Sequence, residues 1–384
     1  MKQIFFVIIT VLVVASCSQE GVENRVAQEV SLENQVVDLS LEIDTVEIDV
    51  DDFGLPYYQV FSLNNAEKNE FFGYNASRHS IDIFNLVDKK HIKSIPLFKE
   101  GPDGVSEVKA MKVLNDGSIY LFGRNEICNL NSEGQVINKQ RIQSGHKFYS
   151  EYNLYPHHST SLAYEESSDA LITGSVNIKV SSYSQPEKFY KRSNIVAQVS
   201  QDKNEIESIP LPYPKAYSEK YFGFLDAPYI SVQDGKIYAS FPAVSDISCY
   251  DLEKEELSIL KVNPKLTKAE ATSLDWSDSK HQDKKMAHFT RSLNYGPIHF
   301  LDDQRFIRIV QDELPAHQLD LRNAFTLKKM VLEYVDLESN TIKEIVLDNN
   351  KVNYFWSFTL EGDLYMTAFV EEETKLRFLK VSIT

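Results

Sequence analysis

The chain has 384 residues and a formal net charge of −16, a length that suits one large all-β domain or two ordinary ones. Its acidic balance disfavours nucleic acid as a partner, because binding to phosphates requires a basic surface. It also disfavours electrostatic adsorption to an anionic membrane, so membrane association would need another anchor.

The first residues have the pattern of a targeting segment. Lys2 precedes an almost wholly apolar run at residues 4–14, which is shorter than the roughly 20 apolar residues of a membrane-spanning helix and ends in small residues, as a secretory signal does. Two small residues directly precede Cys17, and this ending resembles a bacterial lipobox, in which the cysteine thiol is acylated. The resemblance implies a signal peptide at residues 1–16 and a lipid on Cys17. The alternative is an ordinary signal peptide with a chance cysteine.

The segment after Cys17 is polar and has neither a helix nor a strand period, so residues 17–38 are predicted to form a flexible tether. An aspartate after the lipidated cysteine would indicate retention in the inner membrane. Ser18 stands there instead, so the lipobox resemblance implies the outer membrane. Whether the protein faces the periplasm or the cell surface stays open.

The rest of the chain repeats one unit of antiparallel strands. Residues 39–50 alternate with a period of two that shifts at Asp44-Thr45, which predicts one or two strands with a bulge or bend. Tight-turn dipeptides such as Asp234-Gly235 then separate short apolar and aromatic runs. The predicted strands, grouped in units, are 59–61, 70–74, 80–86 and 91–97; 110–114, 118–122, 126–131 and 136–142; 161–164, 170–173, 194–199 and 206–211; 229–232, 237–241, 247–252 and 257–262; 298–301, 305–310, 330–335 and 342–347; and 354–358, 364–369 and 376–383.

Repeated four-strand units indicate a β-propeller. The last unit has three strands, and a ring left open would expose a sheet edge. Residues 39–50 supply the missing strand. We therefore predict an all-β, six-bladed propeller over residues 39–384, closed by an N-terminal strand, with seven blades as the alternative.

Two short motifs carry a family resemblance. Glu100-Gly101-Pro102-Asp103-Gly104-Val105 lies between the first and second units, and Tyr250-Asp251-Leu252 ends a strand of the fourth. Together with the lipobox, they resemble a family of uncharacterised bacterial cell-envelope lipoproteins that carry a domain of unknown function and are related to six-bladed propellers. The family usually has Asn where Asp103 stands, a change that preserves turn chemistry. The resemblance covers roughly residue 40 to the C-terminus and implies no reaction.

The lengths of the connections predict which face of the ring binds a partner. In a four-stranded blade, the turns between strands one and two and between strands three and four emerge on one face, and all other connections emerge on the opposite face. The first set is short. The second set is long and comprises residues 99–107, 144–158, 175–193, 212–228, 263–295 and 311–328, with a possible helix or two at 267–286. Long insertions on one face of a repeat protein usually form its binding surface.

Residues with ligand-binding chemistry concentrate on this predicted long-loop face. Aromatic, arginine and histidine side chains around a concave opening suit a glycan, peptide or other carboxylated ligand, or a protein. The alternative for each one is a solvated loop residue or a cap on the core. The candidates are Arg78, His79, Arg124, His157, His158, Trp276, Tyr295, His317 and Trp356.

No motif assigns a chemical reaction. Gly-rich phosphate loops, a nucleophile elbow and spaced metal ligands are absent from the sequence, so we expect no cofactor and no metal. Cys128 and Cys249 lie in different units and are interpreted as buried fillers. The leading hypothesis is a monomeric, lipid-anchored outer-membrane propeller that binds a ligand or protein through its long-loop face. The alternative is a cell-surface propeller hydrolase or lyase that acts on glycans or peptides.

Overall fold

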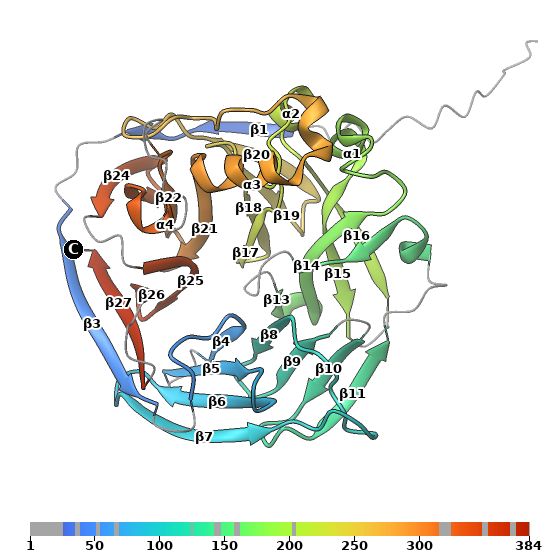
Figure 1. The fold of residues 1–384 in the computed structure, drawn as a ribbon, viewed down its shortest axis with the longest axis vertical. Helices are drawn as coiled ribbons and strands as arrows, with labels where there is room; N and C mark the ends of the chain where they lie inside the picture. The colour runs from blue at the N-terminus through green and yellow to red at the C-terminus, as the bar shows by residue number, and fades with distance from the viewer. Residues whose placement is uncertain are drawn as a thin grey trace, which may run out of the picture.

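The computed structural model describes residues 26–34, 39–50, 54–64, 69–123, 126–141, 147–156, 162–201, 205–314, 324–347, 352–368 and 374–383. Within these ranges the strands form six sheets, which are arranged as the blades of a ring (Figure 1). The predicted six-bladed propeller is confirmed, and the seven-bladed alternative is wrong.

In each blade the first strand lies nearest the centre of the ring (Figure 1). Blades I and II contain β4 (Phe61–Asn64), β5 (Glu70–Asn75), β6 (Ser80–Asn85), β7 (Lys90–Pro96), β8 (Ala110–Val113), β9 (Ile119–Phe122), β10 (Glu126–Leu130) and β11 (Val136–Arg141). Blade III contains β13 (Leu162–Glu165), β14 (Ala170–Asn177), β15 (Asn194–Ser200) and β16 (Ile206–Pro212), with β12 (Tyr152–Leu154) also paired to β14. Blades IV to VI contain β17 (Tyr229–Gln233), β18 (Lys236–Ser240), β19 (Ile247–Asp251), β20 (Glu256–Lys261), β21 (Asn294–Phe300), β22 (Arg305–Gln311), β23 (Met330–Asp336), β24 (Thr341–Leu347), β25 (Val352–Leu360), β26 (Asp363–Ala368) and β27 (Lys375–Ile383).

The tight turns form where the dipeptide pattern predicts them. Asp234 and Gly235 both have positive φ, at 49° and 67°, and they join β17 to β18 in the two-residue geometry that matches the twist of a hairpin. Gly117 and Gly362, with φ of 87° and 82°, occupy the equivalent turns of blades II and VI. These φ values are accessible to glycine without a steric penalty, so the turn residues determine where the strands end.

Blade VI is completed by an early strand, as predicted. Strand β3 (Leu41–Asp49) pairs antiparallel with β27, from Leu41 opposite Ile383 to Asp49 opposite Lys375. Phe71 of blade I packs on Phe358 and Phe378 of blade VI, with ring centroids 5.6 and 5.3 Å away. Val46 joins the same core. The closing strand therefore contributes hydrophobic packing as well as backbone hydrogen bonds.

The bulge predicted at Asp44-Thr45 is wrong, because β3 and β27 stay in register through both residues. The change of period has another cause. Val46 and Ile48 face the core shared with blade I, whereas Leu41, on the opposite side of the strand, packs on the core shared with blade V. One side of β3 is therefore buried in its first part and the opposite side in its second part. The alternation of apolar and polar residues reverses between the two parts without a backbone irregularity.

The predicted tether at residues 17–38 is wrong for residues 26–34. Strand β1 (Val26–Ser31) pairs parallel with β20, and β2 (Glu33–Asn34) pairs parallel with β24. Between them Leu32, which is 3% exposed, enters the core between blades IV and V. Most of the described side chains from Gln28 to Asn34 are exposed, which conceals the strand character of this segment, because its backbone covers the outer edges of two blades.

Candidate ligand-binding face and central channel

The α-helices in the described residues all lie in segments predicted to be long connections. Helix α1 (Pro186–Arg192) is inserted in blade III, α2 (Lys215–Glu219) precedes blade IV, α3 (Gln282–Arg291) precedes blade V, and α4 (Ala324–Leu327) is inserted in blade V. A short 3₁₀ helix, η3 (Trp276–Lys280), comes before α3, so the helical character expected at 267–286 is present. Figure 1 shows these helices over blades III to V. We call them the cap.

The cap has a buried interior of its own. Lys285 of α3 is 1% exposed, and its Nζ lies 4.2 and 4.8 Å from the ring centroids of Tyr183 and Phe224, a cation–π arrangement. Asp226 accepts a hydrogen bond from the Tyr190 hydroxyl at 3.2 Å. Burial raises the pKa of Asp226 to about 6, against the opposing effect of the Tyr190 hydrogen bond and the Lys285 charge, and burial lowers the pKa of Lys285. Because burial disfavours the charged forms of both Asp226 and Lys285, the attraction between them stabilises the cap only in part.

Trp276 belongs to this interior. Its indole stacks on Tyr221 with centroids 5.5 Å apart and planes at 30°, and it packs against the hydrophobic core under the cap. The predicted ligand-binding role therefore has a competing structural explanation, because most of the ring is used to hold η3 on the propeller.

Tyr295 is fully buried beneath the connection between blades IV and V. Its ring packs on the guanidinium of Arg308, 4.4 Å from Cζ to the centroid, and its hydroxyl donates to the Lys268 carbonyl. Arg308 in turn forms a fully buried ion pair with Glu333, whose pKa is raised by burial in spite of Arg308. Tyr295 is thus placed to fix the chain path and not to contact a surface ligand.

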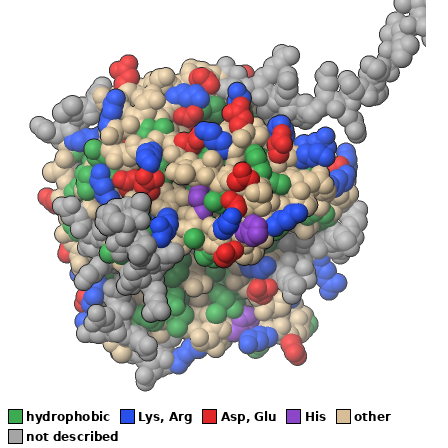
Figure 2. Space-filling model, turned by 45° about the horizontal axis from the view of Figure 1, so that its top comes forward, with side chains coloured by type: hydrophobic (Ala, Val, Ile, Leu, Met, Phe, Trp, Pro, Cys, Tyr) green, Lys and Arg blue, Asp and Glu red, His purple; other side chains and the backbone are tan. Residues whose placement is uncertain are grey.

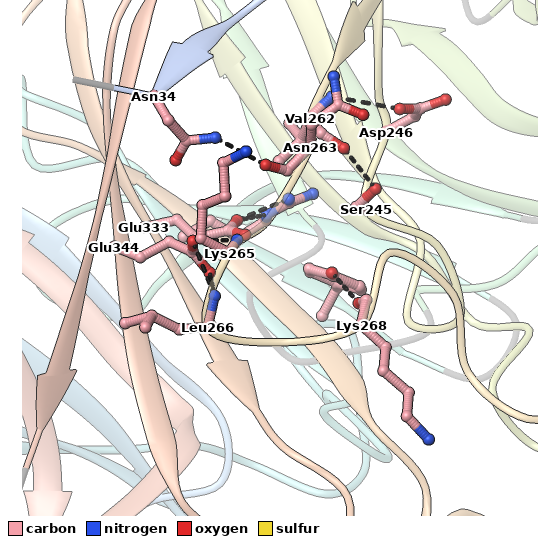
Figure 3. A network of polar contacts seen from close by, with 12 residues as sticks. Asn34, Ser245, Asp246, Val262, Asn263, Lys265, Leu266, Lys268, Glu333 and Glu344 are labelled. Atoms are coloured by element: carbon pink, nitrogen blue, oxygen red, sulfur yellow. Dashed lines mark hydrogen bonds and ion pairs between the residues drawn. The ribbon is translucent and has the colours of Figure 1, made fainter.

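A polar network fastens the start of the same connection (Figure 3). The Glu344 carboxylate accepts the backbone N–H groups of Lys265 and Leu266, and Asn34 of β2 donates to the Asn263 carbonyl. On the other side the Ser245 hydroxyl donates to the Val262 carbonyl at 2.8 Å. These contacts to backbone groups fix the start of the connection that carries η3 and α3.

The turn between β5 and β6 on the long-loop face carries Arg78 and His79. Arg78 is exposed, and its backbone N–H donates to Asn75 Oδ1. His79 is 4% exposed, has φ of 54°, and has Nδ1 2.8 Å from the Tyr74 hydroxyl. Of this adjacent pair, only Arg78 has a side chain at the surface.

Trp356 is half-buried and packs against the hydrophobic core between blades I and VI. It lies in a bulge of β25, between Asn353 and Ser357, and stacks face to face on Tyr57 with centroids 4.9 Å apart and planes at 5°. Tyr57, which is 44% exposed, was missed by the sequence analysis because it precedes β4 in a segment without an insertion. Its ring offers an exposed flat surface of the kind that sugars and aliphatic groups contact.

The other predicted site residues, Cys17, Arg124, His157, His158 and His317, lie outside the described residues. Cys128 is a buried free thiol and Cys249 is a half-buried one, so the predicted burial is wrong in degree for Cys249. Burial raises their pKa values to about 12 and about 11. Both therefore remain protonated at neutral pH, in agreement with a filling role.

The visible surface in Figure 2 shows acidic and basic side chains interspersed.

The inner strands enclose a cavity of about 320 Å³ in the centre of the ring. All six blades contribute residues of their inner strands to its wall. The lining residues are Phe61, Ser62, Leu63, Met111, Lys112, Leu162, Ala163, Tyr229, Ile230, Ser231, Val232, Gln233, Pro297, Ile298, His299, Phe300, Ser357, Phe358 and Thr359.

The ionisable side chains that line this channel are Lys112, Tyr229 and His299, and the sequence analysis singled out none of them. His299 Nε2 lies 2.7 Å from Ser357 Oγ, which donates its own proton to the Tyr354 carbonyl at 2.6 Å; the imidazole therefore donates and the hydroxyl accepts. Burial lowers the pKa of His299 to about 3, so the ring is neutral at physiological pH. Burial also lowers the pKa of Lys112, against the opposing effect of the Glu166 carboxylate. The sequence signal that could have identified Lys112 and His299 is a polar residue within a predicted inner strand.

Across the described ranges, no three His, Cys, Asp or Glu side chains group closely enough to hold a metal ion. None of the helices in those ranges has the length and apolarity that crossing a bilayer requires.

The comparisons with known proteins give a family and a fold. The family model described as a domain of unknown function, DUF4221, matches residues 37–346. A member of the DUF4221 family from Bacteroides vulgatus is similar in structure, with a TM-score of 0.75 and 15% identity over 90% of this chain and 98% of that one. A putative exported protein from Bacteroides fragilis has a TM-score of 0.59 and 11% identity over 93% of this chain and 99% of that one. No curated protein matches the sequence. The chain therefore belongs to the DUF4221 family of domains of unknown function, as its sequence motifs imply.

Proposed function

We propose that the protein is a lipid-anchored outer-membrane propeller that binds a ligand or protein partner through its long-loop face. The anchor is supported by the lipobox ending at Cys17. It is also supported by the similarity in fold to a protein described as a putative exported protein. A lipid on Cys17 would hold the acidic propeller at a membrane that its charge does not attract.

The attachment point of the N-terminal segment supports an orientation. Strand β1 begins with Val26 beside Leu257, next to the short turn that precedes β20, and it ends beside Lys261, next to the long connection. Residues 18–25 separate Cys17 from β1 and span at most about 29 Å when fully extended. A lipid on Cys17 would therefore hold the short-turn side nearer the membrane and leave the long-loop face directed away from it.

The observation that carries the binding proposal is the one-sided placement of the cap together with the stacked Tyr57–Trp356 pair, of which Tyr57 is exposed. The α-helices of the described residues lie on the long-loop face, and the stacked pair is on the same side, with Tyr57 before β4 and Trp356 in the bulge of β25. Loops and exposed aromatics can vary there without disturbing the stacked sheets. A glycan, a peptide or a folded protein would each meet this surface first.

The hydrolase alternative receives little support from the channel. His299 and Ser357 are within hydrogen-bond distance, but the serine proton is donated to the Tyr354 carbonyl. A base whose pKa is about 3 accepts a proton poorly at neutral pH. In the described residues, no carboxylate lines the channel to orient the imidazole.

One experiment tests the anchor. Cys17→Ser is expressed beside the wild type, followed by labelling with a clickable fatty acid and separation of envelope fractions. We expect the label and outer-membrane recovery for the wild type, and loss of both for C17S. Equal outer-membrane recovery of an unlabelled wild-type protein would contradict lipid anchoring.

A second experiment tests the face. Envelope extract is passed over immobilised wild type, Tyr57→Ala and, as a control on the short-turn face, Glu253→Ala. We expect Y57A to lower the recovery of bound components at least tenfold, and E253A to leave it unchanged. Equal recovery by all three proteins would contradict the proposed face, provided that all three have the same unfolding midpoint.

A further inference from the structure

An apolar groove lies on the outer side of the ring, between blades III and IV. It has a volume of about 630 Å³ and is lined by α2, by the outer strands of blade IV and by the connection that follows β20. Its exposed wall is more apolar than polar, and its size is within the range of small-molecule sites. The apolar side chains that are half-buried or exposed, and so accessible to a ligand, are Pro212, Pro214, Ala216, Ile259 and Ala269.

Each charged side chain of the described wall already has an ion-pair partner. Lys261 lies 2.9 Å from the carboxylate of Asp246 and 3.4 Å from that of Glu29 on β1. The pairs at the wall are Lys261 with Glu29 and with Asp246, Lys215 with Glu219, and Glu270 with Lys220. The groove therefore offers apolar contact without an unmatched charge, which suits an uncharged aliphatic chain.

The N-terminal segment enters the fold at this groove. Val26, the first residue of β1, lies beside Leu257, and Leu257 lines the groove. The six residues of β20, which forms one wall, span about 20 Å. Residues 18–25 span at most about 29 Å, so a lipid on Cys17 can reach the whole length of this wall.

The chemistry of the N-terminal segment indicates which part of it would occupy the groove. Residues 18–25 are polar except for Gly21 and Val22, so they have little apolar surface to bury. The acyl chains of a lipid on Cys17 consist of methylene groups, each of which is stabilised by removal from water. In the mature segment before β1, the lipid is therefore the group that matches the wall.

We propose that this groove holds an acyl chain of the lipid on Cys17 while the protein is outside a membrane. The proposal rests on the lipid anchor of the proposed function. An acyl chain in the groove is shielded from water, and a bilayer, which can bury all of the acyl chains, draws it out again. The N-terminal segment thus has two positions for its lipid, one on the propeller and one in the membrane.

The test uses the full-length lipoprotein from cells grown with a palmitate analogue that carries a diazirine and an alkyne. The purified protein is transferred to detergent-free buffer, the monomeric fraction is irradiated, and cross-linked peptides are identified by mass spectrometry. Ile259→Asp places a charge in the groove wall, and Ala216→Trp fills part of the groove. Ile137→Asp is the matched control, because Ile137 is 62% exposed on the outer strand of blade II.

We expect cross-links from the acyl chain to peptides that contain Pro214, Ala216 or Ile259 in the wild type and I137D, and at least tenfold fewer in I259D and A216W. Without detergent the wild type and I137D should stay monomeric in gel filtration, whereas the two groove variants should associate. The wild-type cross-link positions decide the question even if neither groove variant folds.

Labelled wild-type protein without cross-links to the groove would overturn this proposal and leave the anchor intact, as would equal cross-linking in all four proteins. Protein that carries no label would overturn the anchor and this proposal together. The presence of the label therefore separates the two failures.

Discussion

His299 should make the propeller sensitive to acid, and His299→Gln should remove much of that sensitivity. The imidazole is 9% exposed, and its pKa is lowered by burial to about 3, whereas an unfolded histidine titrates near 6.5. Between these values the unfolded chain binds a proton that the folded chain excludes. Stability is therefore unaffected by this group above about pH 6.5 and is lost as the pH falls below it.

The two pKa values set the size of the effect. At pH 4.5 the unfolded histidine is almost fully protonated and the folded one is not, which corresponds to a loss of about 3 kcal/mol relative to pH 7. H299Q keeps an amide N–H that can reach Ser357 and has no titratable group. Any cost of the substitution itself appears equally at both pH values.

Urea unfolding followed by tryptophan fluorescence at pH 7 and pH 4.5 measures the difference. We expect the wild type to lose about 3 kcal/mol more than H299Q between the two pH values, and the more exposed His91→Gln to behave like the wild type. If H299Q and the wild type lose the same stability, the assignment of a buried neutral imidazole to the channel wall is refuted.

Three further variants test other parts of the structure. Asp226→Asn should cancel a fall in stability of up to about 3 kcal/mol between pH 4 and pH 6, because the folded state binds a proton there that the unfolded carboxylate, with its lower pKa, has released; unchanged pH dependence in urea unfolding would contradict this. Lys328→Met should remove a rise in stability of about 2 kcal/mol between pH 7 and pH 9, since burial lowers the pKa of Lys328 to about 7 and the unfolded lysine keeps its proton in that range; thermal unfolding at the two pH values decides. Leu32→Ala should cost about 2–4 kcal/mol by emptying the core between blades IV and V, whereas the exposed Glu33→Ala should cost less than about 0.5 kcal/mol. Equal losses for these last two variants would show that the N-terminal strands are not packed on the ring.

The blades and their closure were predictable because both depend on local chemistry. Turn residues such as Asp234-Gly235 mark the ends of strands, and a last unit with three strands required a fourth from residues 39–50. The N-terminal pairing was not predictable, because β1 and β2 are polar and bind blade edges through backbone groups. Among the described side chains from Gln28 to Asn34, Leu32 is buried and Val30 is half-buried, which is too weak a signal to separate a strand from a tether.

Candidate site residues were harder to predict, since burial depends on contacts distant in sequence. Tyr295 and His79 lie in the expected connections, yet both are buried. Tyr57 is exposed and is held in place by stacking on Trp356, a residue almost 300 positions later in the sequence. Lys112 and His299 come together only because six inner strands converge on one axis. The long-loop face was therefore predictable as a region, and its individual side chains were not.

Photo-crosslinking in living cells tests the central claim that the long-loop face meets the partner. A photoreactive benzoylphenylalanine replaces Tyr57 on this face or Glu253 in the short turn before β20, and the irradiated envelopes are analysed by immunoblot and mass spectrometry. The account predicts a discrete, saturable adduct from position 57 and no matching adduct from position 253. The same adduct from both positions, or from position 253 alone, would contradict it.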